Sequence, residues 1–155
     1  MDPRLTILII DDDPNDVLLL RKALTRAEIH DPVQVVTDGF QAIQYLSGEG
    51  MYGNREQFPF PSVVFTDLKM PRINGFEVLQ WLRKHPDCSV IPVMVLSASK
   101  IDADIKRAYQ LGANAYLAKP SSMKELVEAV KTAYSFWAHC EKPQVSAMKC
   151  FEAVE

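Results

Sequence analysis

Five short apolar runs alternate along the chain with longer segments in which apolar residues recur every three or four positions. The runs occupy residues 5–10, 33–36, 62–66, 90–96 and 115–118. Their β-branched and aromatic residues are typical of strands, and the almost continuous apolar character of the first run suits a strand covered on both faces. The periodicity between the runs predicts helices. The alternation therefore predicts an α/β protein with a parallel sheet between layers of helices.

Capping residues mark where several helices begin and end. Asp13 suits the N-cap of the first helix, and Ser122 opens a capping box before the last one. Gly112 suits the left-handed position that follows the end of a helix. With 155 residues the chain suits one domain, which we place at 4–140, and we expect 141–155 to be a tail without a domain of its own.

Residues 48–61 interrupt the alternation. The segment is rich in glycine, begins with three closely spaced glycines and ends with two prolines. It is longer than the usual connection between a helix and a strand. An ordered surface insertion and a plain connector are both compatible with this composition.

Composition and charge exclude several classes of partner. The chain has 17 basic and 20 acidic residues and a net charge of −3, which does not fit the basic surface of a nucleic-acid binder. No apolar run approaches the roughly 20 residues that span a bilayer. The N-terminus leads directly into the first strand, without the pattern of a signal peptide. We therefore expect a cytoplasmic protein with no nucleic-acid or membrane partner.

Residues whose side chains can bind a ligand or take part in a reaction follow four of the five predicted strands. They are Asp11 and Asp12 after the first strand, Asp67 after the third, Ser97 after the fourth and Lys119 after the fifth. The carboxyl ends of parallel strands share one edge of a sheet, which is where ligands bind in such folds. Carboxylates that meet there repel one another unless a cation lies among them. Oxygen ligands suit Mg²⁺, so the pattern predicts a Mg²⁺ site.

Four motifs formed around these residues are together similar to those of the receiver domain of two-component response regulators. They read IIDD at 9–12, TDLKMP at 66–71, VLSA at 95–98 and YLAKP at 116–120. The resemblance covers roughly residues 4–135. It implies a flavodoxin-like (βα)5 fold, a doubly wound five-stranded parallel sheet with the family's strand order 2-1-3-4-5.

The resemblance also implies a role for each acidic residue. Asp67 is expected to be the phosphoacceptor. Asp12 and Asp67 are expected to bind Mg²⁺ directly, with the backbone carbonyl of Lys69 as a third protein ligand. Asp11 is expected to act through a metal-bound water. An aspartyl phosphate suits a reversible signal because it can be hydrolysed again.

On the opposite side of the site, the resemblance implies phosphate-binding and switch residues. Lys119, Ser97 and Ala98 are expected to bind the phosphoryl group. Ser97 and Tyr116 are expected to switch conformation when Asp67 is phosphorylated. The peptide bond before Pro120 is expected to be cis, as in the family.

The expected function is that of a single-domain response regulator. It would accept a phosphoryl group from a sensor histidine kinase and signal by a phosphorylation-dependent contact with a downstream protein or a phosphotransfer protein. It would not be an enzyme beyond its own phosphotransfer and autodephosphorylation. The insertion at 48–61 and the long last helix are similar to small receivers paired with phytochrome-type kinases. The surface formed by helix four, strand five and helix five is expected to carry the output, and self-association as a homodimer is left open.

Three other functions were weighed. A haloacid-dehalogenase-like phosphatase places Thr or Val where this chain has Asn15. A flavodoxin-like FMN site needs a phosphate-binding loop after the first strand, and the acidic loop at 11–13 would repel phosphate. A receiver-fold scaffold that docks without phosphorylation remains the alternative.

Overall fold

The computed structural model describes residues 5–86 and 88–143. In chain order the elements are β1 (Ile7–Ile10), α1 (Pro14–Arg26), β2 (Val33–Val36), α2 (Gly39–Ser47), η1 (Gly50–Gly53), β3 (Val63–Thr66), α3 (Gly75–Lys84), η2 (Cys88–Val90), β4 (Val93–Ser97), α4 (Asp102–Gln110), β5 (Ala115–Ala118) and α5 (Met123–His139). The η elements are short 3-10 helices. The predicted alternation of strands and helices is confirmed.

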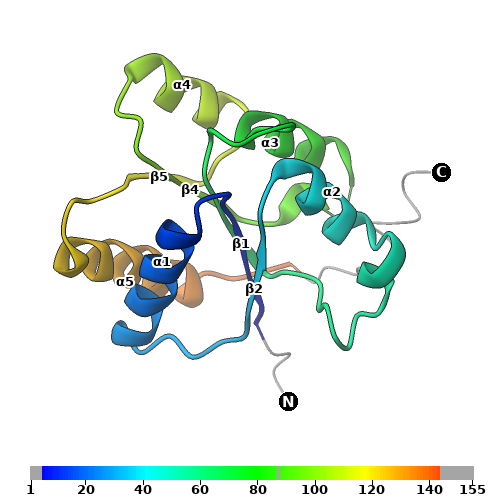
Figure 1. Cartoon of the computed structure of the whole chain (residues 1–155), viewed down its shortest axis with the longest axis horizontal. Helices are drawn as coiled ribbons and strands as arrows, with labels where there is room; N and C mark the ends of the chain where they lie inside the picture. The colour runs from blue at the N-terminus through cyan, green and yellow to red at the C-terminus, as the bar shows by residue number, and fades with distance from the viewer. Residues whose placement is uncertain (1–4, 87, 144–155) are drawn as a thin grey trace.

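The five strands form one parallel sheet in the order β2-β1-β3-β4-β5, as predicted. Helices α1 and α5 cover one face of the sheet, and α2, α3 and α4 cover the other (Figure 1). Ile10 pairs with both Val36 and Thr66. This register brings the residues that follow β1 and β3 to the same edge of the sheet.

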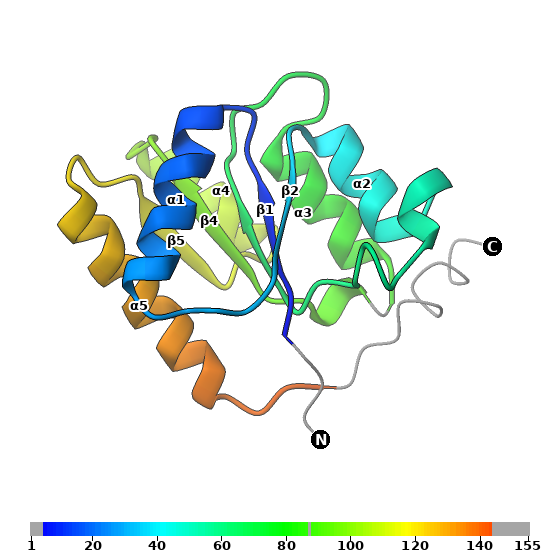
Figure 2. The same ribbon diagram turned by 60° about the horizontal axis from the view of Figure 1, so that its bottom comes forward.

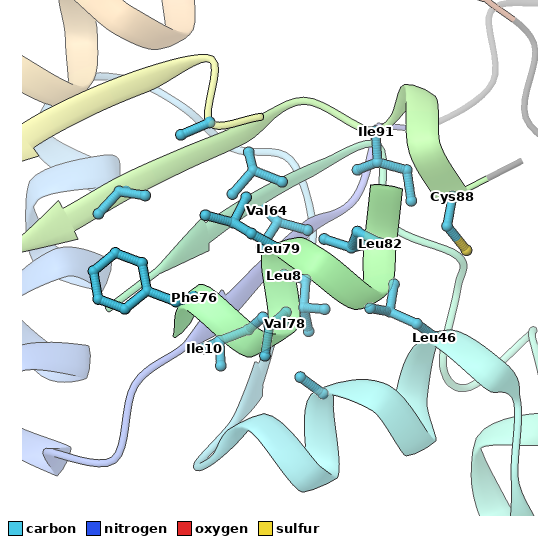
Figure 3. Close-up of a cluster of buried hydrophobic side chains, with 14 of the residues drawn as sticks. Leu8, Ile10, Leu46, Val64, Phe76, Val78, Leu79, Leu82, Cys88 and Ile91 are labelled. Atoms are coloured by element: carbon cyan, nitrogen blue, oxygen red, sulfur yellow. The ribbon is translucent and has the colours of Figure 1, made fainter. Parts of the chain in front are cut away.

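Each face of the sheet has its own hydrophobic core. Leu8 and Ile10 of β1 belong to the core under α2 and α3, which is shown in Figure 3. Ile7 and Ile9 belong to the core under α1 and α5. All four side chains are at most 1% exposed. Burial on both faces explains why β1 is apolar at every position.

The structure differs from the sequence prediction at the start of β4. Residues 88–90 form η2, and the strand begins at Val93 rather than at residue 90. Pro92 has no N–H to donate to a neighbouring strand, so it precedes the ladder, although its carbonyl accepts the N–H of Val64 at 3.0 Å. Ser97 is consequently the last residue of β4 rather than the first of a loop.

The expected cis bond before Pro120 is also wrong. The described part of the chain contains no cis peptide bond, so the bond between Lys119 and Pro120 is trans. The trans form is the intrinsically preferred one even before proline.

The segment at 48–61 packs against α2, as Figure 2 shows beside the cyan helix. Three aromatic rings pack together here, with pairwise distances of 5.0–6.1 Å between the ring centroids of Tyr45, Tyr52 and Phe58. Arg55 lies over Tyr45 and donates to the carbonyl of Leu46 at 3.1 Å. Because these contacts fix the segment to the end of a helix, it is an ordered insertion rather than a plain connector.

The last helix, α5, ends at His139, and Ser122 caps its start by accepting the N–H of Glu125 at 3.2 Å. In the chain described, none of the helices is long and apolar enough to cross a membrane. The predicted tail at 141–155 lies outside the described residues from residue 144 onward, so the domain division at 140 stays a prediction.

Candidate functional site

The sheet places two aspartates side by side at its carboxyl edge. Asp11 and Asp67 directly follow β1 and β3. Their N–H groups donate to Val36 at 3.1 Å and to Ile10 at 2.9 Å, which extends the hydrogen bonding of the strands by one residue. Oxygen atoms of Asp11, Asp12 and Asp67 all lie within 4.8 Å of one another. The convergence expected from the sequence is therefore present.

Local backbone groups orient the carboxylates of Asp11, which is buried, and Asp67, which is half-buried. Asp11 Oδ1 accepts the N–H of Asp13 at 3.0 Å, and Asp67 Oδ1 accepts the N–H of Leu68 at 2.7 Å. The Oδ2 atoms of both residues face Lys119. Asp12 is exposed, whereas Asp11 is only 6% exposed. The site is thus open on the side of Asp12.

Lys119 reaches into the acidic group from the end of β5. Its Nζ atom donates to Asp16 at 2.7 Å, to Asp67 at 2.9 Å and to Asp11 at 3.1 Å. Burial disfavours the charged ammonium, but the hydrogen bonds to Asp16 and Asp67 outweigh it and raise the pKa of Lys119 above its usual range. Lys119 therefore stays protonated at neutral pH.

The sequence analysis did not assign Asp16 to this site. It lies in the first turn of α1, where an acidic residue is favoured by the helix dipole in any protein. The position of Asp16 in the chain could have indicated it, because the start of α1 lies at the same sheet edge as Asp11.

The site carries more negative than positive charge. The described residues place the carboxylates of Asp11, Asp12, Asp16 and Asp67 around the single ammonium of Lys119. Burial raises the pKa of Asp11, although the N–H of Asp13 and the ammonium of Lys119 oppose the shift. An oxygen-only set with excess negative charge fits a hard divalent cation such as Mg²⁺.

An open cleft of about 520 Å³ lies beside Asp12. Lys69 lines it together with Phe76 and Arg107, and the guanidinium of Arg107 lies 4.2 Å from the centre of the Phe76 ring. Lys69 itself is exposed. The cleft leaves the Asp12 side of the acidic group open to solvent.

The loop after Asp67 is fixed by close packing against α3. Gly75 donates its N–H to the carbonyl of Leu68 at 2.9 Å. A Cβ atom on Gly75 would lie only 2.1 Å from the carbonyl oxygen of Asp67. Asn74 and Glu77 form a complete capping box at the start of α3. The loop after Asp67 and α3 therefore hold one another in place.

A second anchor joins this loop to α2. Asp38 caps α2 by accepting the N–H of Gln41 at 2.8 Å and forms an ion pair with Arg72. Gly39 donates its N–H to the carbonyl of Ile73 at 3.0 Å. Although burial raises the pKa of Asp38, the hydrogen bonds from Gln41 and Arg72 hold it below its usual value. Sequence reasoning missed this anchor because its partners are 34 residues apart.

The predicted switch residues are linked through Ser99. Ser97 is buried, and its Oγ accepts the N–H of Ser99 at 3.1 Å. The carbonyl of Ser99 accepts the Tyr116 hydroxyl at 2.8 Å, and its own hydroxyl donates to Asp104 of α4 at 2.6 Å. Three elements, β4, β5 and α4, thus meet at one residue.

Ala98, the remaining residue predicted to bind phosphate, lies between Ser97 and Ser99 in the sequence. Ala98 is exposed at the end of β4. The N–H of Lys119 donates to the carbonyl of Ser97 at 2.7 Å, which ties the end of β5 to that of β4. The structure therefore brings the predicted metal and phosphate ligands to the same sheet edge, whereas Tyr116 lies within β5 and reaches that region only through its hydroxyl.

Comparison with known proteins agrees with this arrangement. A family model for the response regulator receiver domain matches residues 7–131. Response regulator Rcp1 of Synechocystis sp. (strain ATCC 27184 / PCC 6803 / Kazusa) is 33% identical over 136 residues, which cover 88% of this chain and 90% of Rcp1. The structure of the Mn²⁺-bound form of Rcp1 aligns over 92% of this chain and 100% of its own, at 32% identity and a TM-score of 0.79.

Two further solved structures are similar over nearly the whole chain. RPA3017, a response regulator in red light signaling of R. palustris, is 34% identical with a TM-score of 0.86, covering 91% of this chain and 99% of its own. The phosphorylated cyanobacterial phytochrome response regulator RcpA is 32% identical with a TM-score of 0.83, covering 92% and 100%. With the family model matched across most of the chain, this protein belongs to the response regulator receiver domain family.

Proposed function

We propose that this chain is a response regulator that accepts a phosphoryl group on Asp67 with the help of Mg²⁺ and signals by a protein contact. The observation that carries the proposal is the position of Asp67. Its carboxylate lies between an acidic pair suited to a metal and an ammonium 2.9 Å away. A carboxylate in that setting can attack phosphorus while positive charge on both sides offsets the charge of the phosphoryl oxygens.

The reaction forms one bond and breaks one. An oxygen of Asp67 attacks the phosphorus of a phosphohistidine, the P–N bond breaks, and the histidine leaves as an imidazole that takes up a proton. Asp12, Asp67 and the backbone carbonyl of Lys69 would hold Mg²⁺, with Asp11 acting through a water. Bound there, Mg²⁺ supplies charge stabilisation to the phosphoryl oxygens. The comparable protein Rcp1 has been solved with Mn²⁺ bound.

Lys119 and Ser97 would hold the transferred group from the other side. Lys119 donates to Asp67 before the reaction and can donate to a phosphoryl oxygen after it. The Ser97 hydroxyl can give its proton to another oxygen while its Oγ still accepts the N–H of Ser99. The exposed Ala98 adjoins this position and completes the proposed phosphate contacts.

Movement of Ser97 toward a phosphate would reach the surface through Ser99. The Ser99 carbonyl holds Tyr116, and its hydroxyl holds Asp104 in the first turn of α4. The output surface is proposed to lie on α4, β5 and α5. Phe136, 74% exposed, and Tyr109, 49% exposed, are apolar groups available there for a protein contact.

The proposed phosphoryl donor is a sensor histidine kinase of the phytochrome type, and this protein is proposed to act in the cytoplasm. The support is similarity to RcpA, named as a phytochrome response regulator, and to RPA3017, named for red light signaling. A downstream protein or a phosphotransfer protein would receive the signal, and homodimer formation is a further proposed output. Transfer rates from phytochrome-type and unrelated kinases would test the donor, and faster transfer from an unrelated kinase would argue against it.

The phosphoacceptor is tested by incubation with acetyl phosphate and Mg²⁺ followed by mass spectrometry. The wild-type protein should gain one phosphoryl group, and Asp67→Asn should gain none. Asp13→Asn is the matched control, because it removes a nearby carboxylate but keeps a side chain that caps α1. A gain retained in Asp67→Asn would contradict the assignment. Absence of any gain in the wild type would favour a docking role without phosphorylation.

A further inference from the structure

Asp16 contacts the centre of the acidic site, but the proposed function gives it no role. Its side chain is 34% exposed in the first turn of α1, and its Oδ2 atom lies 2.7 Å from Lys119 Nζ. The helix dipole favours an acidic residue there in any protein. That general effect does not explain why Asp16, 103 residues away in sequence, makes the shortest of the three contacts of Lys119.

Lys119 uses all of its hydrogen-bond donors. An ammonium group carries three N–H donors, and here they are directed to Asp16, Asp67 and Asp11. The lysine side chain is long and flexible, so the positions of its acceptors decide where the charge lies. Two of these acceptors belong to the proposed metal and phosphoryl machinery. Asp16 belongs to α1 instead, and it binds the ammonium without being one of the proposed metal or phosphoryl ligands.

We propose that Asp16 is a positioning residue that holds Lys119 for phosphoryl transfer to Asp67, an inference that rests on the proposed function. Before transfer, Asp16 takes a share of the positive charge, which limits how tightly Lys119 pairs with the attacking carboxylate. During transfer, the hydrogen bond that Lys119 gives to Asp67 passes to a phosphoryl oxygen. The bond to Asp16 keeps the ammonium in place while this exchange occurs.

Removal of the charge at Asp16 has two consequences that can be measured separately. In Asp16→Asn the ammonium pairs more strongly with Asp67 and Asp11. The attacking oxygen is then less available, so phosphorylation slows at saturating donor and Mg²⁺. The uncompensated ammonium also opposes a cation among the same carboxylates, so Mg²⁺ binds more weakly. Loss of a group that orients a metal-site residue typically costs about tenfold or more, and we expect about tenfold in each quantity.

The chain offers a matched control in the same turn. Asp13→Asn removes one negative charge three residues from Asp16, but the Asp13 carboxylate accepts the N–H of Asn15 at 2.8 Å and serves as the helix cap. Asparagine caps helices as well as aspartate does. Asp13→Asn therefore reports the general effect of losing one charge near the metal. Asp16→Glu keeps the carboxylate and should recover most of the lost rate.

The experiment compares these three variants with the wild type on the full chain. Mg²⁺ affinity is measured by calorimetry without a phosphoryl donor, and the rate is measured by mass spectrometry with acetyl phosphate. The NMR signal of the Lys119 ammonium gives a third readout, which should show slow proton exchange in the wild type and fast exchange in Asp16→Asn.

The expected result is that Asp16→Asn loses both rate and affinity, while Asp13→Asn and Asp16→Glu stay close to the wild type. Equal losses in Asp16→Asn and Asp13→Asn would reduce the effect to general charge and overturn the proposal. A faster rate in Asp16→Asn would overturn it as well, because Asp16 would then compete for Lys119 rather than position it. A wild-type protein that gains no phosphoryl group would refute the proposed function itself, whereas the calorimetry and NMR would still report on Lys119.

Discussion

Replacement of Gly75 by alanine tests whether the loop after Asp67 depends on its contact with α3. The added Cβ would lie 2.1 Å from the carbonyl oxygen of Asp67 and 2.9 Å from the Cα of Leu68. Both atoms belong to the backbone, so no side-chain rotation can relieve the overlap. The helix and the loop must separate, and the loop begins at the proposed phosphoacceptor.

The size of the effect follows from two opposing contributions. Alanine is favoured over glycine within a helix by at most about 1 kcal/mol. Overpacking of a rigid interior costs about 1–3 kcal/mol. Because two backbone groups of the loop lie within contact distance, we place Gly75→Ala at the upper end of that range. The expected net loss is about 2–3 kcal/mol, which corresponds to a fall in Tm of about 4–12 °C for a chain of this size.

Urea unfolding and the rate of phosphorylation by acetyl phosphate measure the two consequences of this substitution. Gly53→Ala is the matched control, since a Cβ there would meet only the carbonyl of Gly48, at 3.2 Å. The control should change stability by less than about 0.5 kcal/mol and leave the rate unaltered. If Gly75→Ala unfolded at the same urea concentration as the wild type and reacted at the same rate, the packing argument would be refuted.

Three further expectations concern charge and the insertion. The pKa of Asp38 is lower in the folded state than in the unfolded state. Its ion pair with Arg72 therefore stabilises the protein at pH values above the unfolded pKa of 3.8, and this stabilisation is lost as the pH falls through the folded pKa. Arg72→Ala should therefore cost about 0.5–1 kcal/mol at neutral pH and nothing in strong acid, as shown by urea titrations across pH. The pKa of Asp11 is raised in the folded state. Asp11 therefore contributes folding stability at pH values below its unfolded pKa of 3.8, and this contribution is lost as the pH rises through its folded pKa. Mg²⁺ should reverse that loss in the same titrations, and a metal-independent pH profile would speak against the site. Tyr45→Phe removes the hydroxyl that donates to the carbonyl of Pro59 at 2.6 Å and should cost about 1 kcal/mol in thermal melts. No change on this substitution would mean that the insertion is held by its other contacts, without this hydrogen bond.

The sequence predicted the fold and most of the site for a shared reason. Hydrophobic periodicity distinguishes strands from helices, and parallel topology then brings all strand ends to one edge. These two facts place Asp11, Asp67 and Lys119 at one edge, whereas the strand order and the role of each residue came from the resemblance to receiver domains. The start of β4 was misplaced because Val90 belongs to a 3-10 turn, which periodicity over so few positions does not reveal.

What the sequence did not reveal depends on contacts between distant segments. Asp16 meets Lys119 only because α1 starts at the same sheet edge as β5 ends. Arg72 meets Asp38 because its backbone adopts a φ of 65°, a left-handed conformation that no residue-type signal at that position predicts. Phe40 of α2 is likewise 43% exposed, and the Arg72 guanidinium lies 5.1 Å from its ring.

The arrangement of charge around Lys119 explains how one site can serve two states. In the unmodified state, the ammonium offsets part of the charge of three carboxylates, all within 3.1 Å. The proposed transfer of a phosphoryl group to Asp67 would replace one of those carboxylates with a group of greater charge, roughly −1.5 to −2 for a phosphate at neutral pH. The attraction for Lys119 and for the hydroxyl of Ser97 would then grow at one point while Asp11 and Asp16 remain available to Lys119. Because Ser97 is already joined through Ser99 to Tyr116 and to α4, we propose that this local increase in attraction would favour a different position of the proposed output surface.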